Sequence, residues 1–269
     1  MPDFLLGHWP IGGRGRRINV RRELLRISSD PMRPLLDILG SGEFELLSSD
    51  ESRYTDAYWF YYLSFDRYLH EMSVAARYSK GPYWIRISGG KAKYTPLQQS
   101  LADQYRKVAP FLEYDLVNCL IHSRILLDRV TGLARHFLKG ERLPSFTSFN
   151  EHKKFFVKLA QPYGKHEEYA EFIRKHTDWF DMPLKEVRDK FVVHSSPKHL
   201  RVLGYPNDYE LHLNILLPDS NDPERPLAKT KLITVNPLRM SYDIESFLKW
   251  FCGYGLAALK LRKLNTNAP

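Results

Sequence analysis

Residues 53–79 constrain the fold most, because they combine helical spacing with an unusual density of aromatic side chains. A helix with so little polar surface must be surrounded by other elements, so we expect it at the centre of a helical bundle. Exposed rings could instead form a platform on which nucleic-acid bases stack, but core packing is the favoured interpretation. The large side chains concerned are Tyr54, Tyr58, Trp59, Phe60, Tyr61, Tyr62, Phe65, Tyr68 and Leu69.

Other segments repeat apolar residues at intervals of three and four, which is the spacing of one helical face. The pattern predicts one helix over 97–108, ending near Pro110, and a second over 111–138. These segments make the predicted fold class mainly α. Further helices are expected around 34–39 and at 148–161, 166–179, 182–196 and 241–263.

Two regions have the character of β-strands. Gly89 and Gly90 separate two short extended runs, which predicts a β-hairpin. Residues 209–217 alternate apolar and polar side chains, and 229–235 form a further extended run. We therefore expect a small antiparallel sheet within 198–236, inserted between helices.

The domain organisation follows from these elements. Residues 1–50 are expected to form an N-terminal arm with a short helix, and 51–269 to form one helical domain that carries the β insertion. The arm contains a Gly/Arg cluster at 12–17. Such a cluster either contacts phosphates or is a solvated tail, and the second is the commoner case.

The predicted helix 111–138 carries polar residues beside its apolar stripe. Arg124 and Asp128 have the spacing of an i,i+4 ion pair. We expect this helix to pack against 182–196 and to provide a carboxylate there. The polar line consists of Asp115, Asn118, His122 and Arg129.

The composition describes a basic chain with enough apolar residues for a core. The net charge is +9 and the isoelectric point about 9.4, values that favour a polyanionic partner, most commonly a nucleic acid. A basic protein without such a partner is the alternative. No signal peptide and no stretch of ~20 apolar residues is found in the sequence.

Two cysteines are too few for a structural metal site, and neither a metal nor another cofactor is expected. Cys119 lies on an apolar helical face, which predicts a buried free thiol and favours a reducing, cytoplasmic location. The His-Glu-x-x-His pattern and the nucleophile elbow are both missing from the sequence.

A polar interruption in one helical stripe is the strongest functional signal. Leu184, Val187 and Phe191 step along one face, but the next position of that face is His194. Arg188 lies beside the same stripe. Buried polar groups without partners cost roughly 1–3 kcal/mol. Either polar partners cover this face, or it opens on a functional site.

A purely structural interpretation of the pair also exists. Arg188 could bind a nearby carboxylate, and the helix dipole favours His194 in a last turn. Arg129 and His136 form a second pair of this kind. Two features distinguish the first pair: Asp189 follows Arg188 directly, and a proline three residues after His194 ends the helix.

The pattern Arg188-Asp189-x4-His194 resembles the signature of HEPN domains, which has an arginine, a polar residue and a histidine four to six positions after the arginine. These domains are small helical bundles. The resemblance covers roughly residues 100–197 and 237–265 and implies a HEPN-like bundle. Many HEPN domains are metal-independent ribonucleases of toxin–antitoxin, phage-defence and RNA-processing systems, whereas others only bind RNA or protein or form dimers.

Arginine and histidine suit metal-free RNA cleavage, in which the 2′-hydroxyl attacks the adjacent phosphate to give a cyclic phosphate and a 5′-hydroxyl. Histidine transfers protons near neutral pH, so His194 is the candidate acid or base. The fork of Arg188 suits a crowded phosphate, and Asp189 could orient either group. Lys190, Lys198 and Arg201 are candidate nucleic-acid contacts, with ordinary surface charges as the alternative.

Helix geometry favours a site built from two chains. Six residues of ideal helix rotate by ~600°, which leaves Arg188 and His194 about 120° apart. The HEPN resemblance implies a homodimer that acts on RNA. Packing two copies of 182–196 against each other would bury Val187 and Phe191 at the shared interface. An antitoxin or another protein partner is also expected. The alternatives are a non-catalytic HEPN-like module that binds RNA or protein, and a helical protein in which the motif is accidental.

Overall fold

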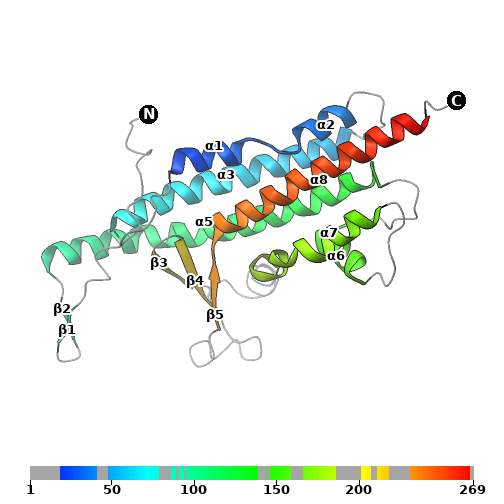
Figure 1. Cartoon of the computed structure of the whole chain (residues 1–269). Helices are drawn as coiled ribbons and strands as arrows, with labels where there is room; N and C mark the ends of the chain where they lie inside the picture. Colours follow the sequence, from blue (N-terminus) through cyan, green and yellow to red (C-terminus); the bar gives the residue numbers. More distant parts are fainter. Residues whose placement is uncertain are drawn as a thin grey trace. The chain divides into compact units, whose positions relative to one another are not determined.

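The computed structural model describes residues 19–40, 48–78, 86–88, 91–93, 95–138, 144, 146–158, 166–185, 201–206, 211–217 and 231–266. Figure 1 shows their helices and strands in chain order. Most of these residues are helical, which confirms the mainly α fold class. None of the helices in this part of the chain is both long and apolar enough to cross a membrane.

The helices largely follow the predicted periodicity. They are α1 (Val20–Ser28), α2 (Arg33–Leu39), α3 (Ser48–Tyr78), α5 (Pro96–Ala134), α6 (Phe149–Lys158), α7 (Glu167–His176) and α8 (Pro237–Thr266). A short 3₁₀-helix, η3 (Asp178–Phe180), and a π-helical turn, η4 (Asp181–Lys185), follow α7. The sequence did not predict α1, although Val20 and Ile27 on one of its sides are buried.

Helix α5 corrects the prediction of two helices separated at Pro110. It is continuous over 39 residues, with Pro110 inside it. Proline removes one backbone hydrogen bond, the one to the carbonyl of Arg106, four residues earlier. Pro110 and Arg106 are both exposed, so water can bind the freed carbonyl and the helix continues.

The strands form two antiparallel sheets. Strands β1 (Arg86–Ser88) and β2 (Lys91–Lys93) pair across the two glycines, with Ile87 opposite Ala92. Strands β3 (Arg201–Pro206), β4 (Leu211–Leu217) and β5 (Lys231–Val235) pair in that order. All three of these lie within the range 198–236, where the sequence predicted a small sheet.

Backbone contacts divide the chain into two compact units. The first consists of Met1–Ser28, Leu63–Cys119 and Arg188–Leu238, and the second of Ser29–Tyr62, Leu120–Val187 and Arg239–Pro269. Both α3 and α5 contribute residues to each unit. The predicted division into 1–50 and 51–269 stays a prediction, since these units are defined by contacts and not by contiguous segments.

The core of the second unit is rich in aromatic rings. Phe149 meets Phe247 edge-on at 5.2 Å between ring centroids, and Phe137 meets Phe251 in the same way at 5.0 Å. Edge-to-face pairs add roughly 0.5–1.5 kcal/mol to the apolar area they bury. Helix α8 also approaches α2 closely, because a Cβ on Gly255 would lie 2.9 Å from Leu35 Cδ2. A side chain at position 255 would require the end of the Leu35 side chain to shift.

The first unit has an apolar core between its parts of α3 and α5. The buried side chains include Phe65, Tyr68, Leu112, Leu116 and Cys119. The Sγ atom of Cys119 lies 3.4 Å from the carbonyl oxygen of Ser64, to which the thiol donates. Burial raises the pKa of this thiol well above its ordinary value. The predicted buried free thiol is confirmed.

The aromatic residues of α3 do not all belong to the core. Those that face inward are Tyr54, Tyr58, Tyr61, Phe65 and Tyr68, as predicted. Trp59 and Phe60, in contrast, are 57% and 51% exposed. Core packing was the wrong interpretation for these two residues, because a helix with rings on all sides cannot bury every side.

Candidate functional site

The sequence-predicted site falls mainly in 186–200, which lies outside the described residues. This range contains Arg188, Asp189, Lys190, His194 and Lys198. Their convergence therefore stays a prediction. The description ends at residue 185 before the motif and resumes at residue 201 after it.

Arg201 is the one candidate contact whose backbone the structure describes. It is the first residue of β3 and pairs with Leu216 of β4. The site can otherwise be built only from the segment that leads into the motif, 166–185, and from the residues that hold this segment in the second unit.

The approach to the motif is fixed by burial. Phe180 in η3 and Leu184 in η4 are fully buried. Leu184 begins the apolar stripe that the sequence predicted, so its burial fits that stripe. The π-helical turn contains Pro183, whose nitrogen carries no hydrogen, and the regular ladder of α-helical hydrogen bonds cannot run through it. The motif begins three residues after this turn.

A buried lysine holds the same segment to α6. Lys153 Nζ donates to the carbonyl oxygen of Thr177 at 2.8 Å and to Asp181 Oδ2 at 2.8 Å. Asp178 Oδ1 lies 3.6 Å from the same nitrogen. A buried ammonium needs such partners, because removing a charge from water costs several kcal/mol. Both turns after α7 are thereby tied to one side chain.

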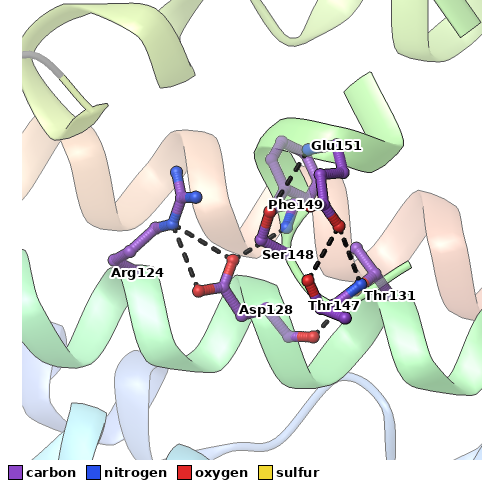
Figure 2. Close-up of polar contacts among 7 residues, drawn as sticks. All are labelled: Arg124, Asp128, Thr131, Thr147, Ser148, Phe149 and Glu151. Carbon is purple, nitrogen blue, oxygen red and sulfur yellow. Dashed lines mark hydrogen bonds and ion pairs between the residues drawn. The ribbon is translucent and has the colours of Figure 1, made fainter. Parts of the chain in front are cut away.

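A buried arginine contacts the segment from α5. The guanidinium carbon of Arg124 lies 4.5 Å from the centroid of the Phe180 ring. Arg124 Nε lies 3.1 Å from Asp128 Oδ1 and donates to Oδ2 at 3.3 Å, as Figure 2 shows. The predicted i,i+4 pair is confirmed. Among the residues that the structure describes, the buried Nη1 of Arg124 has no hydrogen-bond partner.

Asp128 also fixes the start of α6. Its Oδ1 accepts a hydrogen bond from the backbone nitrogen of Phe149 at 2.7 Å, and its carbonyl oxygen accepts one from Thr131 Oγ1 at 2.8 Å (Figure 2). A carboxylate at a helix N-terminus satisfies free amide groups and interacts favourably with the helix dipole. Asp128 of α5 thus links Arg124 of the same helix to the start of α6.

A reciprocal set of hydrogen bonds completes the same helix start. The backbone nitrogen of Glu151 donates to Ser148 Oγ at 3.3 Å. Glu151 Oε2 accepts from the backbone nitrogen of Thr147 at 3.0 Å and from its hydroxyl at 2.8 Å (Figure 2). This variant of the capping box lowers the pKa of the Glu151 carboxyl through its bonds to Thr147. The network therefore has a structural role in positioning α6.

His152 is a buried histidine that sequence reasoning missed. Its Nε2 lies 2.6 Å from the hydroxyl oxygen of Tyr169, and its buried Nδ1 has no hydrogen-bond partner in the described part of the chain. Burial lowers the pKa of His152 to about 3, so the imidazole is neutral at pH 7. The signal that could have found it is its position among Phe149, Phe155 and Phe156.

The predicted polar line of α5 is divided between the two units. In the first unit, Asp115 is fully buried and forms an ion pair of 3.1 Å with Arg67. Burial raises the pKa of the Asp115 carboxyl, and Arg67 opposes that shift. In the second unit, His122 stacks on Phe60, whereas Arg129 is exposed.

The contacts described above position α6 and the segment that precedes the motif. Lys153, Arg124 and Asp128 all hold α6 and the segment before the motif. Across the described part of the chain, no group of three or more His, Cys, Asp or Glu side chains could hold a metal ion. Searches against protein-family models, curated proteins and solved structures found no match to this chain.

Proposed function

We propose that this chain is a metal-independent endoribonuclease of the HEPN type, which acts as a growth-arrest toxin or a phage-defence effector. The observation that carries the proposal is the sequence Arg188-Asp189-x4-His194, three residues after the turn η4, in which Leu184 is buried. A mainly helical fold and a net charge of +9 support an RNA-binding helical domain.

The roles of the three residues follow from their chemistry. His194 exchanges the protons of the reaction: one is removed from the 2′-hydroxyl as oxygen bonds to phosphorus, and one is supplied as the bond to the 5′-oxygen breaks. Arg188 donates to the phosphate oxygens and offsets their negative charge. Asp189 orients the guanidinium or the imidazole. The products are a cyclic phosphate and a 5′-hydroxyl.

The segment that directly precedes the motif in the sequence is held by buried side chains of the second unit. Lys153 and Arg124 hold η3 and η4 from two different helices, α6 and α5. Catalytic groups that start from a fixed support lose less freedom when substrate binds. We propose that a second copy of the chain completes the site, since an ideal helix separates Arg188 and His194 by about 120°.

Cleavage of end-labelled RNA in the presence of EDTA tests the proposal. Wild type should yield cyclic phosphate ends, and His194→Ala should lower the cleavage rate by roughly 10²–10⁴-fold. The matched control is His176→Ala, which removes an exposed imidazole at the end of α7. Equal rates for wild type and His194→Ala would contradict the proposal.

A second outcome would identify the non-catalytic alternative. If neither protein cleaves RNA but both bind it with an affinity that falls with salt, the chain is a binding module. Arg188→Lys separates the two cases further. It keeps the charge but loses the bidentate fork, so cleavage should fall while binding at low salt changes little.

A further inference from the structure

Two aromatic side chains of α3 are exposed where the helix belongs to the second unit. Trp59 and Phe60 are 57% and 51% exposed. Trp59 lies against Tyr62 at 5.5 Å between centroids, and Phe60 stacks on His122 of α5 at 5.6 Å with the rings 19° from parallel. Adjacent residues of an ideal helix lie ~100° apart, so Trp59 and Phe60 project from neighbouring sides of α3. We use the name aromatic face for Trp59, Phe60 and His122. Burial lowers the pKa of His122, which keeps its ring neutral at pH 7.

Two arginines flank the aromatic face. Arg53 precedes Phe60 by seven residues on α3, and Arg129 follows His122 by seven residues on α5. Seven residues of ideal helix rotate ~700° and rise ~10.5 Å, so each arginine lies nearly in line with its ring. Both arginines are exposed, and neither forms an ion pair within the described part of the chain.

The two helices run in opposite directions here, which places both arginines at the same end of the aromatic face. Phe60 contacts His122, whereas Asp50, earlier on α3, lies 3.1 Å from His136, just after α5. Moving from Phe60 to Arg53 and from His122 to Arg129 is therefore a move in one direction. The result is a ring platform with two guanidinium groups about two helical turns away.

Stacking rings beside fixed positive charges match single-stranded nucleic acid. Every base has a face that can stack on an aromatic ring, and arginine binds the phosphates that follow the bases. Asp56, an exposed acid one turn before Phe60, opposes phosphate binding on the same side of α3. The charges of Arg53 and Arg129 outweigh it.

A second copy of this chain fits the aromatic face less well. Aromatic side chains bury roughly 150–250 Å² when covered, so two half-exposed rings offer on the order of 200 Å². A stable dimer needs about 800 Å² from each partner. A twofold contact would also bring together like charges at Arg53 and Arg129, which is unfavourable.

We infer that the aromatic face, with Arg53 and Arg129, binds single-stranded RNA by stacking its bases and pairing with its phosphates. The choice of RNA over other single strands rests on the proposed ribonuclease function. The surface lies in the second unit and does not include the cleavage motif. The surface should bind unpaired bases and should bind duplex RNA weakly, because the bases of a duplex are already paired and stacked.

Fluorescence anisotropy with a short labelled single-stranded RNA tests the inference. The background is His194→Ala, so that the probe is not consumed. Trp59→Ala and Phe60→Ala should each raise Kd roughly 5- to 100-fold, the range for loss of one stacked base. The matched control is Phe111→Ala, which removes a ring that is 54% exposed on α5 in the first unit.

The charged residues supply a second readout. Arg53→Gln and Arg129→Gln should each reduce the slope of log affinity against log salt by about 1. Asp56→Asn should strengthen binding. Duplex RNA of the same sequence should compete weakly, and single-stranded DNA should compete at least in part because its bases also stack. Circular dichroism serves as the control that each variant keeps its helices.

Three outcomes overturn the inference. One is that Trp59→Ala and Phe60→Ala bind like Phe111→Ala. Another is that duplex RNA competes as well as the single strand. The third is a wild-type dimer that Trp59→Ala dissociates, which would make the aromatic face a contact between copies. The ribonuclease proposal is judged separately: cleavage lost in His194→Ala supports it even if the aromatic face is inert, and ring-dependent binding without cleavage supports only the inference.

Discussion

Lys153→Met tests whether one buried ammonium holds the segment before the motif. The side chain of Lys153 is 8% exposed, and that of Asp181 is 53% exposed. Methionine keeps most of the apolar stem but removes one of the two donors to the Thr177 carbonyl, which keeps its hydrogen bond from the backbone nitrogen of Phe180. Loss of a hydrogen bond made by a charged group costs about 1.5–3 kcal/mol. Asp181 loses its partner but regains water, so the ion pair adds at most about 1 kcal/mol.

The expected loss of unfolding free energy for Lys153→Met is therefore about 2 kcal/mol, measured by urea denaturation. Asp181→Asn should cost less, about 1 kcal/mol or below, because the ammonium keeps the Thr177 carbonyl. Lys154→Met, at an exposed position of the same helix, is the control and should change little. The reasoning is refuted if Asp181→Asn costs as much as Lys153→Met, or if Lys153→Met behaves like Lys154→Met.

Four further changes probe other parts of the molecule. Burial lowers the pKa of His152 to about 3, so as the pH falls below about 6.5 the imidazole is protonated in the unfolded chain before it is protonated in the fold, and the free energy of unfolding decreases by about 2 kcal/mol from this group between pH 7 and pH 5. In urea denaturation His152→Leu should lose correspondingly less stability over this pH range. Equal losses for His152→Leu and wild type would contradict the assignment. Ser148→Ala removes the N-terminal cap of α6 and should cost about 1 kcal/mol, measured the same way. Phe191→Asp should give monomers of near-native helical content without ribonuclease activity, measured by sedimentation and cleavage, whereas an unfolded variant would mark Phe191 as a core residue. Reversing the charges of Lys198 and Arg201 should weaken RNA binding in anisotropy with folding intact, and unchanged binding would remove both from the site.

Helix positions were predictable where apolar residues repeat over many turns. Helices α3 and α8 extend the predicted ranges 53–79 and 241–263 by a few residues towards the N-terminus. The spacing of apolar residues did not predict that α5 continues through Pro110. The cost of the missing hydrogen bond depends on whether water reaches the carbonyl of Arg106, and that exposure cannot be seen in the sequence. The spacing also failed at Trp59 and Phe60, since a helix with rings on every side has no period that selects the exposed ones.

In the candidate site, polar contacts could be predicted only between residues that are close in the sequence. Arg124 and Asp128 were predicted as a pair because four residues of helix bring them together whatever surrounds them. Lys153 meets groups 24 and 28 residues further along the chain, and His152 meets a hydroxyl 17 residues away. Such partners are brought together only by tertiary packing, so no local spacing reveals them. The same limit holds for the proposed site: the spacing of Arg188 and His194 is the basis of the proposed chemistry, whereas any partners that would bring both side chains to one phosphate are not encoded in that spacing.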